Sequence, residues 1–365
     1  MATICLNMIV KNESEIIEKA LHSLAPHIDY YLICDTGSTD NTPELIRNFF
    51  ETQGIRGEIH NIDFVNFEYS RNKALQLAQH ATEPFDYILL TDADMELRVL
   101  NPEFRTLLTE PCYRLRQEND TLAYENVRLL RKDADAKYVG VTHEYVDFKG
   151  TPSSFKDIYF YDHANGASRT EKFERDAKLL SHALIDDPGN TRYCFYLAQT
   201  YYDMGDYPKA KAYYKKRAEM GGWVEEVYYS YYRVGLIETF LSSPEADILK
   251  AFMDAYNYRP IRAESLFELA RYYRVAEKYP AGYLYAKAAA NIAYPENDVL
   301  FIDKTIYDYK IADELSICAY WVGAYQESFD LCEALLKNPA LPQEYIERVQ
   351  ANLQFAADQL KKAPV

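Results

Sequence analysis

The chain has 365 residues, of which 48% are hydrophobic and 26% charged, proportions typical of a soluble globular protein. This length allows two domains, and the sequence contains no uncharged apolar run of the roughly 18 residues that suggest a transmembrane helix. The net charge of −16 argues against a nucleic-acid partner, because binding to phosphate backbones depends on clustered lysine and arginine. An acidic protein needs a bound cation or a few placed arginines to hold a phosphorylated small molecule.

The first part of the chain alternates short strand-like runs with amphipathic helical patterns. The strand-like runs lie at residues 3–10, 30–35, 58–64 and 86–90, and the helical patterns at 13–24, 42–54 and 69–81. This alternation predicts a largely parallel sheet with helices on both faces. The ligand site of such a sheet lies at the carboxyl ends of its strands.

Three further strand-like runs follow, at residues 112–118, 123–132 and 137–148. We expect them to extend the sheet as antiparallel strands. Beyond about residue 170 the strand signals stop and helical patterns take over. The sequence therefore predicts an α/β domain at residues 1–170 and an all-α domain at 171–365.

Repeated helical hairpins with tetratricopeptide-like spacing fill the second half. Three copies are recognisable, a degenerate copy lies between the first two, and a closing helix follows at residues 343–360. Such hairpins stack into a curved solenoid with a concave surface. The leucine, turn and tyrosine positions of the three copies are Leu197, Gly205 and Tyr207; Leu269, Glu277 and Tyr279; and Leu315, Gly323 and Tyr325.

The six cysteines are scattered without the CxxC spacing of a zinc site, which favours reduced thiols. The first residues, MATICLNMIVKNE, lack the basic segment and the small-residue cleavage site of a secretory signal. Together these features predict a cytoplasmic protein.

An acidic pair, Asp92 and Asp94, directly follows the apolar strand run 86–90. Two carboxylates at such spacing past a strand end can bind one divalent cation, and Mg²⁺ or Mn²⁺ prefers oxygen ligands and phosphates. The chain has 56 acidic residues, so an Asp-x-Asp in an exposed loop also arises by chance. The neighbouring motifs decide between these two interpretations.

Four motifs stand together in one order: MIVKNE after the first strand, CDTGSTDNT after the second, YSRNKAL at the third helix, and LLTDADMEL. In this order and spacing they resemble the nucleotide-sugar-binding half of the inverting family-two glycosyltransferases. The resemblance covers roughly residues 1–180 and implies the GT-A fold, a Rossmann-like α/β domain.

The resemblance assigns the nucleotide contacts. It implies that Asp35 reads the base, that Val10 and Glu13 lie near the base and ribose, and that Arg71 lies against the nucleotide. Each assignment has a structural alternative. Asp35 could instead cap its own turn, and Arg71 could pair with Glu68 on the surface of a helix.

The resemblance also implies that Asp92 and Asp94, with Ala93 between them, contact the donor. Both acids would hold Mn²⁺ or Mg²⁺ on the diphosphate. His163 matches a histidine that precedes a Lys-x-x-Arg helix in a subgroup of these enzymes, and is implied as a third metal ligand.

The segment YVGVTHEYV resembles the Gly-x-x-His-Glu segment of the same subgroup. Inverting transfer needs a carboxylate that removes the proton of the acceptor hydroxyl. Glu144 is the candidate base and Asp147 the reserve candidate. Lys172 and Arg175 of the Lys-x-x-Arg helix would contact phosphate, unless they lie on a solvated first turn.

These features predict a metal-dependent, inverting glycosyltransferase that moves a sugar, with UDP as the expected nucleotide, to a glycan or protein acceptor. The helical domain would contribute to acceptor binding or form a homodimer. Two alternatives stay open. One is a nucleotidyltransferase, although MIVKNESE lacks the glycine-rich basic loop of that class. The other is a tetratricopeptide-type interaction scaffold with an inactive transferase domain.

Overall fold

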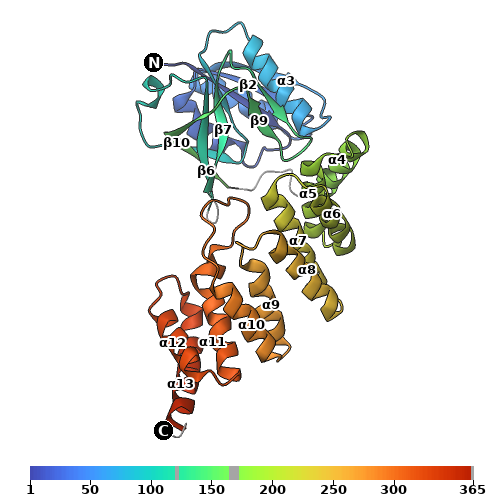
Figure 1. Cartoon of the computed structure of the whole chain (residues 1–365). Coiled ribbons are helices and arrows are strands. Elements are labelled where there is room, and N and C mark those ends of the chain that lie inside the picture. Colours follow the sequence, from blue (N-terminus) through green and yellow to red (C-terminus); the bar gives the residue numbers. More distant parts are fainter. Residues whose placement is uncertain (120–122, 164–171, 363–365) are drawn as a thin grey trace. The chain divides into compact units, whose positions relative to one another are not determined.

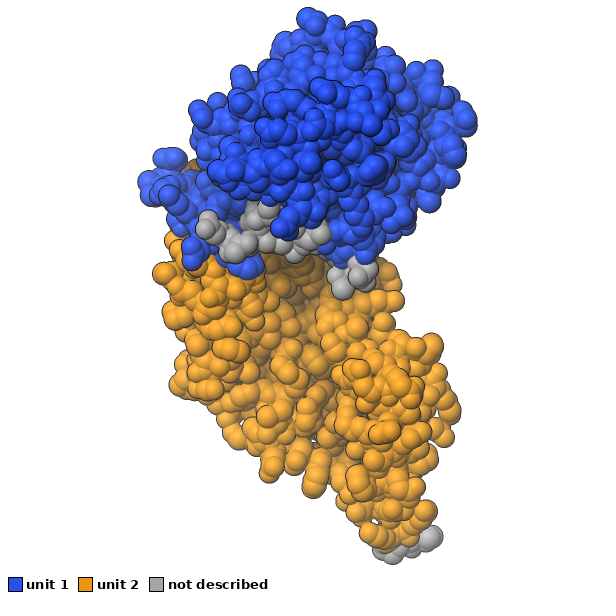
Figure 2. Space-filling model, turned by 180° about the vertical axis from the view of Figure 1, so that it is seen from behind, with its two compact units in different colours: residues 1–186 blue, residues 187–365 orange. Residues whose placement is uncertain are grey.

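The computed structural model describes residues 1–119, 123–163 and 172–362. The chain forms two compact units, Met1–Asp186 (unit 1) and Asp187–Val365 (unit 2), shown in Figure 1 and, by separate colours, in Figure 2. Unit 1 is α/β and unit 2 is helical, which confirms the predicted fold class. The boundary expected at residue 170 lies outside the described residues, and α4 (Lys172–Asp186) groups with unit 1.

Unit 1 is built on an eight-stranded mixed sheet with the order β3-β2-β1-β4-β7-β6-β10-β5. The first four strands in that order are parallel, β7 runs antiparallel to both β4 and β6, and β10 runs parallel to β6 and antiparallel to β5. The strands are β1 (Ile4–Val10), β2 (Tyr30–Asp35), β3 (Arg56–Asn61), β4 (Tyr87–Leu90), β5 (Met95–Val99), β6 (Cys112–Glu118), β7 (Ala123–Arg131) and β10 (Ser153–Asp162).

Helices cover both faces of the parallel strands, because β2 and β4 are apolar on both sides and buried throughout. On one face, α1 (Ile17–Leu24) and α2 (Thr42–Gln53) contribute Leu21 and Phe50 to a core cluster. On the other face lies α3 (Phe67–His80), which packs against β1 and β2 (Figure 1). The prediction of a sheet covered on both faces is confirmed.

The expected third antiparallel strand at 137–148 is wrong. This segment forms a separate hairpin of β8 (Ala136–Val139) and β9 (Tyr145–Phe148). Gly140 and His143 have left-handed backbone angles, with φ of 117° and 52°, and these reverse the chain in the middle of the segment. The main sheet is completed instead by β10 and β5, which the sequence patterns did not reveal.

In its described residues, unit 2 consists of four helical hairpins and a closing helix, as the repeat spacing predicted. The three predicted leucine positions are buried. Gly205, Glu277 and Gly323 share a left-handed turn, with φ of 76°, 58° and 84°. The helices are α5 (Thr191–Asp203), α6 (Tyr207–Glu219), α7 (Val224–Phe240), α8 (Glu245–Tyr258), α9 (Glu264–Val275), α10 (Tyr279–Ala290), α11 (Ile311–Trp321), α12 (Tyr325–Leu336) and α13 (Gln343–Lys362).

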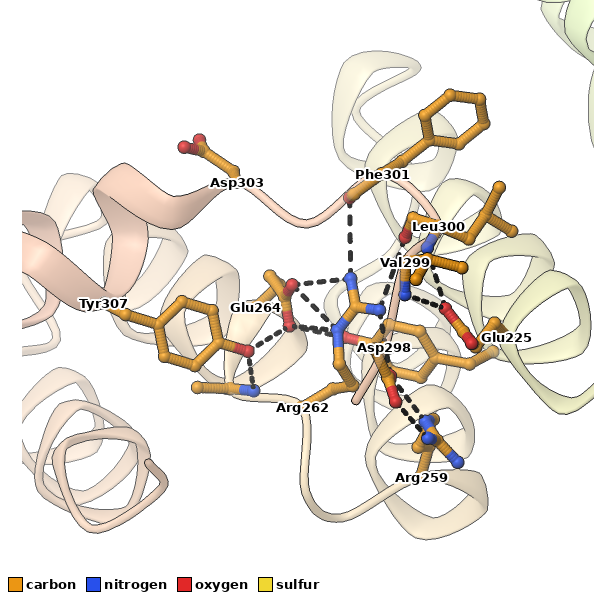
Figure 3. A network of polar contacts seen from close by, with 12 residues as sticks. Glu225, Arg259, Arg262, Glu264, Asp298, Val299, Leu300, Phe301, Asp303 and Tyr307 are labelled. Atoms are coloured by element: carbon orange, nitrogen blue, oxygen red, sulfur yellow. Dashed lines mark hydrogen bonds and ion pairs between the residues drawn. The ribbon is translucent and has the colours of Figure 1, made fainter. Parts of the chain in front are cut away.

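A long connection, residues 291–305, links α10 to the π-helical turn Ile306–Lys310 before α11 and is held by buried ion pairs (Figure 3). Arg262 is 1% exposed and bonds to the carboxylates of Glu264 and Asp298. Glu225 accepts two backbone N–H bonds of 2.7 Å from this connection. These contacts fix the connection to the helices that precede it in sequence.

All six cysteines are buried and unpaired. In the described parts of the chain, no helix is long and apolar enough to cross a membrane.

Candidate active site

The carboxyl ends of the parallel strands bring the predicted nucleotide residues to one edge of the sheet. Val10 at the end of β1 pairs with Asp35 at the end of β2, which pairs with Asn61 at the end of β3. The carbonyl of Val10 accepts bonds from the N–H and the hydroxyl of Thr36, at 2.9 and 3.1 Å. Strand register alone therefore places two of the predicted contacts side by side.

Hydrogen bonds join the two loops that follow β1 and β2. Asp35 is 6% exposed and accepts bonds from the N–H and, at 2.5 Å, the hydroxyl of Ser38. Ser38 in turn accepts the N–H of Asn12. Asp35 thus caps its own turn, as the alternative interpretation expected. Its contact with a nucleotide base stays a prediction.

Asp40 fixes the start of α2 within the same loop pair. Its carboxylate accepts bonds from Thr42 and from the N–H of Ser14, and the N–H of Glu13 donates to the Thr42 hydroxyl at 2.8 Å. Burial raises the pKa of Asp40, but the bonds from Thr42 and Ser14 outweigh it and lower the pKa to about 2. The backbone of Glu13, a predicted ribose contact, is therefore fixed to the start of α2.

Arg71 links two motifs that are far apart in the sequence. Its Nη2 donates to Oδ1 of Asp92 and its Nε to Oε1 of Glu144, both at 2.5 Å. The side chain is 13% exposed, and Glu68 bonds instead to the N–H of Gly140. The alternative in which Arg71 pairs with Glu68 is therefore wrong.

A second arginine, Arg128, reaches Asp92 from β7, and the sequence patterns did not reveal it. Its Nη1 donates to Oδ2 of Asp92 at 3.2 Å, and its Nη2 to Oε1 of the buried Gln117 at 2.8 Å. Burial raises the pKa of Asp92, but Arg71 and Arg128 outweigh it and lower the pKa to about 2. Asp92 is therefore a carboxylate with a guanidinium on each oxygen.

A β-bulge brings Arg128 into the site. On β6, Tyr113 pairs with Leu129 and the next residue, Arg114, pairs with Val127, so Arg128 is the unpaired extra residue. A bulge of this kind re-aims a side chain that the normal alternation would point elsewhere. The only sequence signal is a charged residue inside the apolar run VRLL, and one residue does not reveal a bulge.

Asp94 and His163 lie next to each other through backbone pairing. The N–H of His163 donates to the carbonyl of Asp94 at 3.0 Å, which continues the β5–β10 ladder by one step. The imidazole Nε2 of His163 lies 2.9 Å from Oε2 of Glu96. Ala93, the residue within the acidic pair, is buried in the core and fixes the turn.

The donor atoms suit a divalent cation only together with a ligand. Within the described ranges, no three His, Cys, Asp or Glu side chains are grouped so that they could hold a metal by themselves. Mg²⁺ or Mn²⁺ at a nucleotide site commonly takes one or two carboxylates and completes its shell with phosphates and water. Asp92 and Asp94 fit this pattern, although both oxygens of Asp92 already contact arginine.

The structure also gives the positions of the reserve base and of the two residues predicted to contact phosphate. Asp147, the reserve base, is exposed on β9 opposite Lys137. Lys172 begins α4, and the guanidinium of Arg175 stacks 4.8 Å from the ring of Phe67. The proposed phosphate contacts of these two residues stay predictions.

Comparison with known proteins assigns the class of unit 1. Residues 5–99 match the model of the family Glycosyl transferase family 2. The chain thus carries a family 2 glycosyltransferase domain, followed by tetratricopeptide-like hairpins, and the resemblance indicated by its motifs is confirmed. Val10, Asp35, Arg71 and the acidic pair lie inside the matched range, whereas Glu144 and His163 lie beyond it.

Two curated relatives share parts of the chain. A TPR repeat-containing protein of Synechococcus elongatus is 32% identical over 156 residues, which cover 40% of this chain and 36% of the relative. The prophage-derived glycosyltransferase SunS of Bacillus subtilis is 25% identical over 232 residues, which cover 59% of this chain and 53% of SunS. The chain therefore spans about a third to a half of the length of these relatives.

Solved structures with similarity to the chain include MamA and a tetratricopeptide repeat protein from Parabacteroides merdae. MamA is 16% identical with a TM-score of 0.35, and the match covers 54% of this chain and 92% of MamA. The Parabacteroides merdae protein is 14% identical with a TM-score of 0.38, and the match covers 53% of this chain and 70% of that protein.

Proposed function

We propose that the protein is a metal-dependent, inverting glycosyltransferase that uses a nucleoside-diphosphate sugar, with UDP as the expected nucleotide. The observation that carries this proposal is the bridge through Arg71, which joins Asp92 of the acidic pair to the candidate base Glu144. Three motifs from separate parts of the sequence meet there, and those of Arg71 and Asp92 lie within the range that matches the family 2 model.

On the donor side, Val10, Glu13 and Asp35 would contact the base and ribose, because they line the loops at the ends of β1 and β2. Asp92 and Asp94, with His163 beside them, would hold Mn²⁺ or Mg²⁺. When bound, this cation stabilises the charge on the departing diphosphate.

On the acceptor side, Glu144 would take the proton of the acceptor hydroxyl while its oxygen attacks the anomeric carbon. The bond from that carbon to the phosphate oxygen breaks in the same step, and the electron pair leaves with the nucleoside diphosphate. Inversion follows from a single displacement. Arg71 would orient Glu144, since its Nε bonds to one carboxylate oxygen.

Unit 2 offers a groove for the acceptor, and we assign it to a protein segment. This groove of about 520 Å³ is lined by α7, α9, α11 and α13, by Asp303 of the long connection and by the turn Ile306–Lys310. Its carboxylates Glu314 and Asp313 are nearly buried, and their partners Arg274 and Arg348 are more exposed. Arg274 and Arg348 thus offer N–H donors to the groove, beside the carboxylates of Glu268 and Asp303. N–H donors suit peptide carbonyls and acidic side chains.

The test is to add Mn²⁺ and a panel of nucleotide sugars to the purified chain. We expect thermal stabilisation by one donor and slow release of its nucleoside diphosphate. A chain that no nucleotide stabilises, with or without metal, would instead be the interaction scaffold that the groove of unit 2 also suits. Release of pyrophosphate from a nucleoside triphosphate and a sugar phosphate would identify a nucleotidyltransferase.

A further inference from the structure

Asp92 is bound unequally by its two arginines. Arg71 bonds to two carboxylates, Asp92 and Glu144, both at 2.5 Å. Arg128 bonds to one carboxylate at 3.2 Å and to the neutral amide of Gln117 at 2.8 Å. Opposite charges at shorter distance bind more strongly, so Arg71 is the fixed partner of Asp92 and Arg128 the weaker one.

The guanidinium of Arg128 also has unused hydrogen-bonding capacity. The side chain is 11% exposed, and within the described residues its buried Nε has no hydrogen-bond partner. A buried N–H without an acceptor costs free energy, so a movement that gives Nε of Arg128 an acceptor would be favourable. Gln117 is itself buried and bonded to Asp162, and it can hold Nη2 while the rest of the guanidinium turns.

A divalent cation and Arg128 compete for the same atom. A cation that uses Oδ2 of Asp92 would stand beside the positive charge of Arg128, and the two would repel each other. A diphosphate brought in with the cation supplies new acceptors for a guanidinium. The charges remain balanced if Arg128 leaves Asp92 for the diphosphate as the cation arrives.

We propose that Arg128 is an exchangeable counter-ion, which pairs with Asp92 in the empty site and moves to the donor diphosphate when a divalent cation replaces it. This inference rests on the proposed function. It makes Arg128 a donor-binding residue, held at its far end by Gln117, and leaves Arg71 as the fixed bridge to Glu144.

The proposal predicts effects of opposite sign in one variant. In R128M, Mn²⁺ alone, followed by the EPR signal of the free ion, should bind the donor-free protein at least several-fold more tightly. In saturating Mn²⁺, the affinity for UDP or GDP, measured by calorimetry, should fall about tenfold or more. R131M is the matched control, because Arg131 lies three residues further along β7, is exposed and pairs with Asp133.

The outcomes separate the two proposals. If wild type binds a nucleoside diphosphate with Mn²⁺ but R128M binds both ligands more weakly, or both unchanged, Arg128 is structural and the inference is overturned. If wild type binds no nucleotide of the panel, the proposed function fails and the inference with it. If R128M does not fold, R128K is the variant to use, because lysine keeps a positive charge beside Asp92. For R128K we expect near wild-type affinity for Mn²⁺ and weaker binding of the diphosphate. A diphosphate affinity equal to that of wild type would overturn the inference.

Discussion

Arg71 and Glu144 are 73 residues apart in the sequence, yet Nε of the arginine lies 2.5 Å from Oε1 of the glutamate. Arg71 lies on α3, and Glu144 lies in the turn between β8 and β9. Because Arg71 also bonds to Asp92, the position of the candidate base is tied to the candidate metal site. A substitution that breaks the hydrogen bonds of one of these three residues should therefore shift the other two.

Glu144→Gln should separate donor binding from transfer. The amide keeps the shape of the side chain and an oxygen for Arg71, but it cannot accept the proton of the acceptor hydroxyl. We expect unchanged affinity for the nucleoside diphosphate and a fall in kcat of about 100- to 10,000-fold. Asp147→Asn is the control and should retain wild-type kcat. Equal loss of binding and transfer in Glu144→Gln would mean that Glu144 is structural.

Asp94→Asn should remove metal-dependent activity without unfolding the chain. Asp94 is half-buried in a strand-end turn and is not part of the apolar core. Since a metal ion supplies several kcal/mol of transition-state stabilisation, we expect at least about 100-fold lower turnover. Removing Mn²⁺ and Mg²⁺ from wild type with EDTA should give the same loss. Wild-type turnover of the variant, with an unchanged melting temperature, would contradict the metal assignment.

Glu277→Gly should stabilise unit 2. Glu277 has a φ of 58°, where the repeat copies around Tyr207 and Tyr325 have Gly205 and Gly323. A left-handed non-glycine residue costs about 1–2 kcal/mol, and glycine loses about 0.5–1 kcal/mol in entropy, so a net gain of about 0.5–1 kcal/mol is expected. Urea unfolding followed by circular dichroism measures it. Gly205→Ala should have the opposite sign, and a less stable Glu277→Gly would contradict the shared turn.

Arg262→Met should destabilise unit 2 strongly. Methionine fills much of the volume but leaves the buried carboxylates of Glu264 and Asp298 without the cation between them. Breaking a buried pair from one side costs about 3–5 kcal/mol. The same urea titration shows whether the midpoint falls. Lys250→Met, which breaks an exposed pair with Asp254, should cost less than about 0.5 kcal/mol.

Asp40 should make a pH-dependent contribution to the stability of unit 1. Its pKa is lowered from 3.8 to about 2, so the contribution is complete above pH 3.8 and is lost as the pH falls toward 2. Because the group is partly solvated, we expect about 1 kcal/mol after allowing for screening. Asp40→Asn should therefore be less stable than wild type at neutral pH, and the difference should shrink in acid. A difference that grows in acid would contradict the assignment.

The periodic patterns of the sequence predicted most of the fold, because burial against a sheet or a neighbouring helix repeats at fixed spacing. They located the parallel strands, the helices between them and the four hairpins of unit 2. Position at a strand end was also sufficient to place Asp35, Asp92 and Asp94 at one edge of the sheet, since the carboxyl ends of parallel strands share one edge.

Other features depended on long-range pairing and single backbone angles, which leave no periodic signal. The positive φ angles of Gly140 and His143 turned an expected strand into a hairpin and placed Glu144 beside Arg71. One bulge on β7 directed Arg128 to Asp92. The sequence alone therefore determined the fold class and the edge of the sheet at which donor binding is predicted. Only the tertiary structure decided which side chains neutralise Asp92, because that depends on where each side chain points after the chain has folded.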